Sequence, residues 1–158
     1  MILCLMGQAN FNYWNKTVKV YKENSNYSSD VLCNIENDRV YKKNSSYSSD
    51  VICNIKGQCI YKGTSTYSSD ALYTITNGKV YRGTSTYSSD VLFNIKDGRM
   101  YEGNSTYSSD IIANIRKNKV YKGNSSYSSD VLFNFDGQLS IEQFVAVWHA
   151  YKYGWQVN

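Results

Sequence analysis

The tetrapeptide Tyr-Ser-Ser-Asp occurs six times in the chain, and each copy begins 20 residues after the previous one. The copies begin at Tyr27, Tyr47, Tyr67, Tyr87, Tyr107 and Tyr127. A tyrosine ring can stack on a base or on the flat face of a sugar, while hydroxyl and carboxylate groups beside it hold polar atoms. The motif could therefore bind a small polar ligand several times over.

Catalytic chemistry has little support in these residues. A hydrolytic triad needs a histidine beside the nucleophile, and the Ser-Ser-Asp copies have none nearby in the sequence. The single histidine, His149, follows Trp148 in a predicted helix, where we expect it to be packed or exposed. The chain also lacks a P-loop, a Gly-x-Gly-x-x-Gly motif and a Gly-x-Ser-x-Gly motif. We therefore expect a protein that is not an enzyme.

The repeated motif also has a structural interpretation. Serine and aspartate side chains hydrogen-bond nearby backbone groups in turns, so Ser-Ser-Asp could close a connection between neighbouring units. The same six-fold identity extends to a strand tyrosine, such as Tyr81, and to a loop serine, such as Ser85. Such identity indicates either a recurrent ligand contact or demanding packing between units, and repeat arrays favour packing because they depend on matching interfaces.

For the ligand hypothesis, the candidate residues come from the four central copies and two cations beside the strand tyrosines. They are Tyr47, Ser49, Asp50, Tyr67, Ser69, Asp70, Tyr87, Ser89, Asp90, Tyr107, Ser109, Asp110, Lys62 and Arg82. The cation position is basic in five copies, and Glu102 interrupts the series. We expect a multivalent binder of an intracellular nucleotide or nucleotide-derived signal, acting by sequestration as a phage anti-defence sponge would.

Two alternatives remain open. The aspartate present in all six copies would suit sugar hydroxyls, which favours a lectin-like carbohydrate-binding protein. A tyrosine-rich surface would also suit a structural or protein-interaction scaffold that forms homo-oligomers.

Composition limits the class of protein further. The 158 residues fit one domain, and 15% of them are aromatic, which favours a folded β-rich chain over a disordered one. A net charge of +4 is weak for a nucleic-acid-binding protein, so no specific nucleic acid is expected. Without a convincing signal peptide or membrane span, we expect a cytoplasmic protein that does not bind membranes.

Cysteine usage favours packing over chemistry. Cys33 and Cys53 share one repeat position with Tyr73, Phe93, Ala113 and Phe133, which marks it as an apolar slot. No Cys-x-x-Cys pair is present. We therefore expect no metal site, no disulfide framework and no cofactor.

The sequence pattern of each 20-residue unit predicts a β-hairpin. Val91–Ile95 and Arg99–Tyr101 are rich in strand-forming residues, and Asp97-Gly98 between them is typical of a tight hairpin turn. The prediction is a single, mainly β domain with six or so hairpin repeats over 20–139. Either a compact closed ring or an open β-solenoid suits the regular period, and the compact form is favoured.

Both ends of the chain resemble caps. Residues 1–19 are expected to form a diverged hairpin in which Phe11-Asn12-Tyr13 pairs with Val18–Tyr21. Residues 140–158 are expected to form a C-terminal capping helix, beginning at a Ser-x-x-Gln capping box and running from Ile141 to Tyr153. Its apolar residues have helical spacing on one face, so we expect an amphipathic lid with Trp148 and Trp155 in its core.

The segment Asn77-Gly78-Lys79-Val80-Tyr81-Arg82-Gly83 resembles the Gly-x-x-Tyr-x-Gly core of short β-hairpin repeat families, including, distantly, MORN repeats. MORN units are a little longer and lack the Tyr-Ser-Ser-Asp loop. The layout of hairpins followed by a helix is also similar to β-flower domains, in which hairpins radiate around an axis. The resemblance implies this architecture and no catalytic residues.

Overall fold

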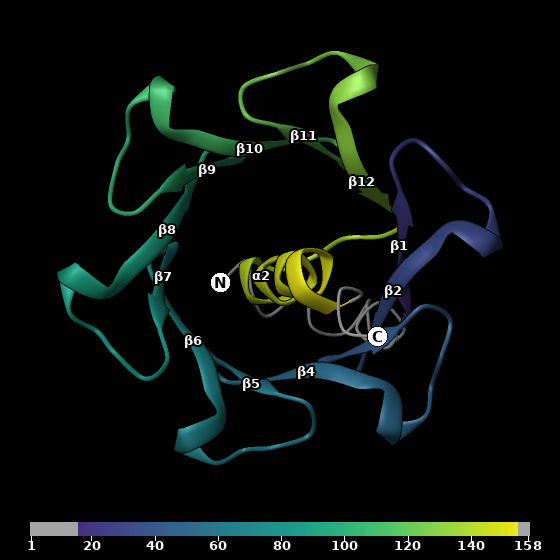
Figure 1. Ribbon diagram of the computed structural model, residues 1–158, viewed down its shortest axis with the longest axis horizontal. Coiled ribbons are helices and arrows are strands. Elements are labelled where there is room, and N and C mark those ends of the chain that lie inside the picture. Colours follow the sequence, from purple (N-terminus) through teal and green to yellow (C-terminus); the bar gives the residue numbers. More distant parts are fainter. Residues whose placement is uncertain (1–15, 155–158) are drawn as a thin grey trace, which may run out of the picture.

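The computed structural model describes residues 16–154, which form a closed antiparallel barrel around one helix. Each strand pairs with the next in the sequence, and β1 pairs with β12 to close the barrel, called the ring below. Figure 1 shows the ring from above, with loops projecting outward between the strands. The predicted mainly β repeat fold is confirmed, and the closed form is the correct alternative.

The ring contains twelve strands of four to six residues. They are β1 (Val18–Lys22), β2 (Val31–Glu36), β3 (Arg39–Lys42), β4 (Val51–Lys56), β5 (Cys59–Lys62), β6 (Ala71–Thr76), β7 (Lys79–Arg82), β8 (Val91–Lys96), β9 (Arg99–Glu102), β10 (Ile111–Arg116), β11 (Lys119–Lys122) and β12 (Val131–Phe135).

Five tight turns join the strands of the hairpins, as the sequence predicts. In β8 and β9, Asp97 and Gly98 both have positive φ, at 52° and 71°. This conformation matches the right-handed twist of the paired strands, and it favours Asn, Asp and Gly. Gly78 has a second constraint, because a Cβ atom there would lie 2.5 Å from the carbonyl oxygen of Ile95.

The sixth hairpin is made by the two ends of the described chain. Val20 lies opposite Phe135 and Tyr21 opposite Asn134, which is the register that Val120 and Tyr121 have in the hairpin of β10 and β11. Since β2 and β12 occupy both sides of β1, neither side is available to the expected partner strand at 11–13. Residues 1–15 themselves lie outside the described part of the chain.

Side chains along each strand point alternately into and out of the ring, and those that point inward are apolar. One inward position is fully buried in every repeat, at Val20, Val40, Ile60, Val80, Met100 and Val120. In the slot predicted to be apolar, Cys33, Cys53, Phe93, Ala113 and Phe133 are buried and Tyr73 is half-buried against the same core, which confirms it as a packing position. Each longer strand has a register shift at its second residue, such as Leu32, and these residues pack against the same core.

The C-terminal helix lies in the middle of the ring (Figure 1). Helix α2 (Ile141–His149) begins at the predicted capping box, in which the Gln143 backbone N–H donates to Ser140 Oγ at 3.1 Å and the Ser140 N–H donates to Gln143 Oε1 at 3.0 Å. One π-helical turn, Ala150–Gly154, continues it. The predicted helix over 141–153 is therefore confirmed.

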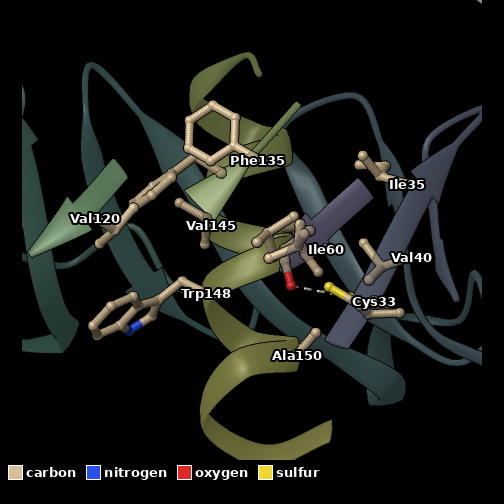
Figure 2. Packing of buried hydrophobic residues seen from close by; sticks show 14 of the residues in the cluster. Cys33, Ile35, Val40, Ile60, Val120, Phe135, Val145, Trp148 and Ala150 are labelled. Atoms are coloured by element: carbon tan, nitrogen blue, oxygen red, sulfur yellow. Dashed lines mark hydrogen bonds between the residues drawn. The ribbon is translucent and has the colours of Figure 1, made fainter. Parts of the chain in front are cut away.

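The surroundings of the helix differ from the expected lid with one apolar face. All residues from Phe144 to Trp148 are buried, whereas Ile141 is 43% exposed. Side chains of the surrounding strands, among them Val120, Ile60 and Val40, belong to the same cluster as Val145 and Trp148 (Figure 2). The helix is thus apolar around most of its circumference because strands surround it. Trp148 is in the core as predicted, and Trp155 lies outside the described residues.

The loop position occupied by Glu23 and Lys43 allows a test of how much a left-handed backbone conformation lowers the stability. Glu23 and Lys43 have φ of 50°, where the other repeats have glycine at 54–57°. Lys43→Gly should raise the free energy of unfolding by about 1 kcal/mol, since a side chain in this conformation costs about 1–2 kcal/mol. The converse change, Gly83→Lys, should lower it by a similar amount. Urea unfolding of both variants measures this, and a destabilised Lys43→Gly protein would contradict it.

Candidate functional site

The six loops that project from the ring share one structure and are called petals here. They comprise residues 23–30, 43–50, 63–70, 83–90, 103–110 and 123–130. In each petal the Ser-Ser-Asp residues form a 3₁₀ turn, from Ser28–Asp30 in the first to Ser128–Asp130 in the last. The tyrosine before each turn is extended, with φ between −78° and −82°.

The petal aspartate closes its own loop. Asp90 Oδ2 accepts a hydrogen bond from Ser85 Oγ at 2.5 Å, and Ser85 Oγ accepts one from the Tyr87 backbone N–H at 3.1 Å. The Asp90 N–H donates to the Tyr87 carbonyl at 2.9 Å. All six petals repeat these three bonds. The loop-closing interpretation is therefore correct for the aspartate, but its hydrogen-bond partner is the loop serine, which lies outside the Tyr-Ser-Ser-Asp motif.

The side chain of the motif tyrosine, in contrast to the aspartate, is mostly exposed to solvent. Tyr27, Tyr47, Tyr67, Tyr87, Tyr107 and Tyr127 are 71–75% exposed. Their turns lie at the outer corners of the petals (Figure 1). The packing interpretation is therefore wrong for these six side chains, although their backbone takes part in closing the loop.

A strand asparagine holds five of the six petals against the wall of the ring, and the sequence interpretation missed it. Asn94 Nδ2 donates to the carbonyl oxygens of Gly103 and Ser105, at 3.2 and 2.6 Å. The same pair of bonds recurs at Asn34, Asn54, Asn114 and Asn134. The signal was present, since five of six copies have asparagine there. The exception is Thr74, which makes one bond, to the Gly83 carbonyl at 2.8 Å.

The candidate residues on different petals are not brought into one site. Tyr47, Tyr67, Tyr87 and Tyr107 belong to four petals that point in different directions around the ring, each with its own serine and aspartate (Figure 1). In Asp110 both carboxylate oxygens accept serine hydroxyls, from Ser105 and Ser109, and these bonds lower its pKa. The petal carboxylate is therefore engaged within its own loop.

Cations and petal residues do meet at the junction between the sixth and first petals. A cavity of about 580 Å³ there is lined by Lys22, Lys122, Ser129 and Asp130, and is called the inter-petal cavity. These four occupy the repeat positions of the predicted Arg82, Lys62, Ser69 and Asp70. The predicted residues themselves do not line this cavity; their repeat equivalents at the closing junction do, with one cation from each side of a Ser-Asp turn.

The inter-petal cavity also has an apolar and aromatic lining that the repeat alone does not supply. Leu32 and Leu132 come from the strand bulges, and Tyr151 comes from the π-helical turn after α2. Glu23 also lines the cavity. Burial and the nearby charge of Glu23 raise the pKa of Tyr151. Tyr151 is contributed once, by the helix, whereas the lysine, serine and aspartate positions recur around the ring.

The helix creates another asymmetric contact inside the ring. His149 is half-buried, and its Nδ1 lies 2.8 Å from the hydroxyl of Tyr73. Its ring also packs against Tyr73 and Tyr153, with centroids 5.4 and 5.1 Å away. Burial lowers the pKa of His149 and raises that of Tyr73. The histidine is therefore packed, as expected.

The buried thiols contribute to packing. Cys33, Cys53 and Cys59 are free cysteines, and burial raises the pKa of Cys53 to about 12. Its Sγ atom donates to the Ala146 carbonyl of the helix at 3.7 Å. Among residues 16–154, no three His, Cys, Asp or Glu side chains are grouped to hold a metal ion. No helix in this part of the chain is long and apolar enough to span a membrane.

The asparagine bonds give a test by exchange between repeats. Asn94→Thr should lower the free energy of unfolding by about 1 kcal/mol, because one carbonyl loses its hydrogen bond. Thr74→Asn should raise it by a similar amount if the second bond forms as in the other repeats. Chemical denaturation of both variants measures these changes. The assigned role would be contradicted if both variants were stabilised or both were destabilised.

The half-buried His149 predicts a dependence of stability on pH. Its pKa is lowered in the folded protein, so the unfolded chain binds the proton more tightly. The contribution is fully present above about pH 6.5 and is lost as the pH falls through the folded pKa. His149→Gln, which retains an acceptor for Tyr73, should flatten the decline between pH 7.5 and pH 5. Thermal unfolding across this range is the measurement, and an unchanged slope would assign the decline to other groups.

Comparison with known proteins identifies the architecture. No curated protein and no solved structure matches the chain. A family model described as "6-fold beta flower protein" matches residues 20–148, which is more than half of the chain and extends from β1 into α2. The predicted β-flower resemblance is thereby confirmed. A ring of hairpins with petals around a central helix, together with this match, shows that the chain belongs to the 6-fold beta flower family.

Proposed function

We propose that this protein is a non-enzymatic, multivalent binding protein for small ligands that combine an anionic group with a flat or apolar part. A nucleotide or nucleotide-derived signal is the class that fits this description best. The inter-petal cavity is the observation that carries the proposal, because it combines two lysines with an apolar lining and a tyrosine.

Two lysines of the cavity could hold an anion at its edge, although the carboxylates of Glu23 and Asp130 in the same lining balance their charge. Lys22 and Lys122 come from strands on either side of the Ser129–Asp130 turn, so one anionic group could contact both ammonium groups. Ser129 can donate its hydroxyl to the same group. Asp130 Oδ2 already accepts the Ser125 hydroxyl at 2.5 Å, so this oxygen is engaged within its own petal. Leu32, Leu132 and Tyr151 offer the apolar surface that a base or another ring requires.

Repetition is the basis for multivalency. Neighbouring repeats pair their cation positions across each petal junction, and four of the six pairs contain two cations: 22/42, 42/62, 62/82 and 122/22. The other two contain Glu102, which leaves one cation in each. We therefore expect more than one bound ligand per chain and unequal affinities, with the strongest binding where Tyr151 adds its ring. Stoichiometric binding without turnover would suit sequestration.

A second candidate function rests on the petal tips. Each has an exposed tyrosine beside exposed serines and a half-buried aspartate. An aromatic face next to hydroxyl and carboxylate groups suits a sugar, so a lectin-like protein with a binding element on each petal is the alternative.

Calorimetric titration against a panel of nucleotides and sugars separates these functions. Replacing Lys22 and Lys122 with alanine should weaken nucleotide binding by about tenfold or more for each lysine at the cavity, because charged hydrogen bonds contribute about 1.5–3 kcal/mol. The control Lys56→Ala/Lys96→Ala removes the same charge from exposed positions near hairpin turns, and it should bind like the unchanged protein.

A different pattern of binding losses would support the second candidate function. Sugar binding that survives Lys22→Ala/Lys122→Ala but is lost on Tyr87→Ser and its equivalents would support the lectin-like function. Equal losses in the cavity variant and the control would show general charge attraction and contradict the nucleotide proposal.

A further inference from the structure

A second hollow lies on the outer wall of the ring, at the hairpin of β10 and β11. It has a volume of about 500 Å³ and is lined by residues 116–119, Tyr121, Ser126 and Asn134. This hollow is called the basic groove. It shares no lining residue with the inter-petal cavity, and neither the repeat motif nor the proposed function accounts for it.

The basic groove has an unusual concentration of positive charge. Residues 116–119 read Arg-Lys-Asn-Lys, with a charge of +3. The corresponding segments 56–59, 76–79 and 96–99 each have a charge of +1, and 36–39 has a charge of −1. No carboxylate lines the groove. The excess is therefore specific to one hairpin and is not a property of the repeat.

Lys117 retains this charge at a position that does not favour lysine. It is the first residue of its turn and has φ of 55°. The other four turns have Asn37, Gly57, Asn77 and Asp97 there, all residue types that tolerate the left-handed region better. Glu23 and Lys43 share this conformation in the loops, so the strain at Lys117 supports a functional position only together with the charge and shape of the groove.

Neutral groups, and not carboxylates, hold the basic side chains in place. Arg116 Nε donates to Asn114 Oδ1 at 3.0 Å, and Lys119 Nζ donates to Asn24 Oδ1 at 2.9 Å. Asn24 is itself fixed by donating from Nδ2 to the Ser128 carbonyl at 2.8 Å. The positive charges are therefore positioned without being neutralised, and Tyr121 adds a half-buried ring in the same hollow.

We propose that the basic groove is a binding site for an oligophosphate, meaning a chain of at least two linked phosphate groups. Arg116 can bind one phosphate through two N–H groups, while Lys117 and Lys119 contact the next as point charges. The oligophosphate could be inorganic or could belong to a nucleoside 5′-triphosphate, and in the second case the base can lie on Tyr121. This site is separate from the inter-petal cavity, and it does not depend on the proposed function.

Calorimetric titration with inorganic tripolyphosphate at physiological salt tests the site. Arg116→Gln/Lys119→Gln should weaken binding by more than tenfold. The matched control is Lys96→Gln/Arg99→Gln, which removes the same charge from the same two positions of the preceding hairpin. It should change the affinity less than twofold. A parallel titration with a nucleoside triphosphate identifies the source, because tighter binding than tripolyphosphate indicates that the base contributes.

A second variant separates binding from folding. Lys117→Gly removes a charge and also relieves the left-handed backbone, so the melting temperature should rise while tripolyphosphate affinity falls several-fold. The proposal would be overturned if the groove variant Arg116→Gln/Lys119→Gln and the Lys96→Gln/Arg99→Gln control lost equal tripolyphosphate affinity. It would also be overturned if neither Lys117→Gly nor the groove variant changed that affinity. Loss of tripolyphosphate binding in Lys22→Ala/Lys122→Ala alone would place the oligophosphate in the inter-petal cavity instead.

Discussion

The ring depends on the pairing of β12 with β1, which joins residues more than 100 positions apart. Open edges of a sheet present unpaired backbone groups, and closing the ring removes them. The pairing is strengthened beyond the strands themselves: Asp136 Oδ1 accepts the Lys19 N–H at 2.8 Å, and Asn134 reaches the carbonyls of Glu23 and Ser25, both at 2.8 Å. The closing hairpin thus reproduces the covalent ones in register and in its asparagine anchor, without a turn to connect it.

Features that depend on local sequence could be predicted. Asp97-Gly98 dictates its turn through the conformations that its two residues adopt, and Ser140 with Gln143 marks the helix start within four residues. The position of the helix inside the ring could not be predicted from local sequence. Alternation shows that one face of a strand is buried, but not that the inner faces of all repeats converge on α2. Ala146 and Val147 are buried only because the ring surrounds them.

Six-fold identity in the sequence did not separate residues that have different roles in the structure. The petal aspartates and loop serines are identical because they close the petals, while the petal tyrosines are identical and exposed. The inter-petal cavity needed information that no single repeat contains, since Tyr151 reaches it from the π-helical turn after α2 and Lys22 from β1, at the other end of the chain. The asymmetric places in the molecule arise where the helix or one unusual turn interrupts the repetition.

The helix inside the ring also fixes how many repeats the protein can have. The bore of a barrel grows with the number of its strands, while an α-helix with its side chains keeps a diameter of about 10–12 Å. Near-identical 20-residue units invite unequal recombination, which adds or removes a hairpin without disturbing the reading frame. A product with one hairpin fewer would have no room for Phe144 and Trp148, and one with an extra hairpin would leave voids around them. The diameter of the helix therefore matches a ring of six hairpins, and it would oppose the gain or loss of one repeat.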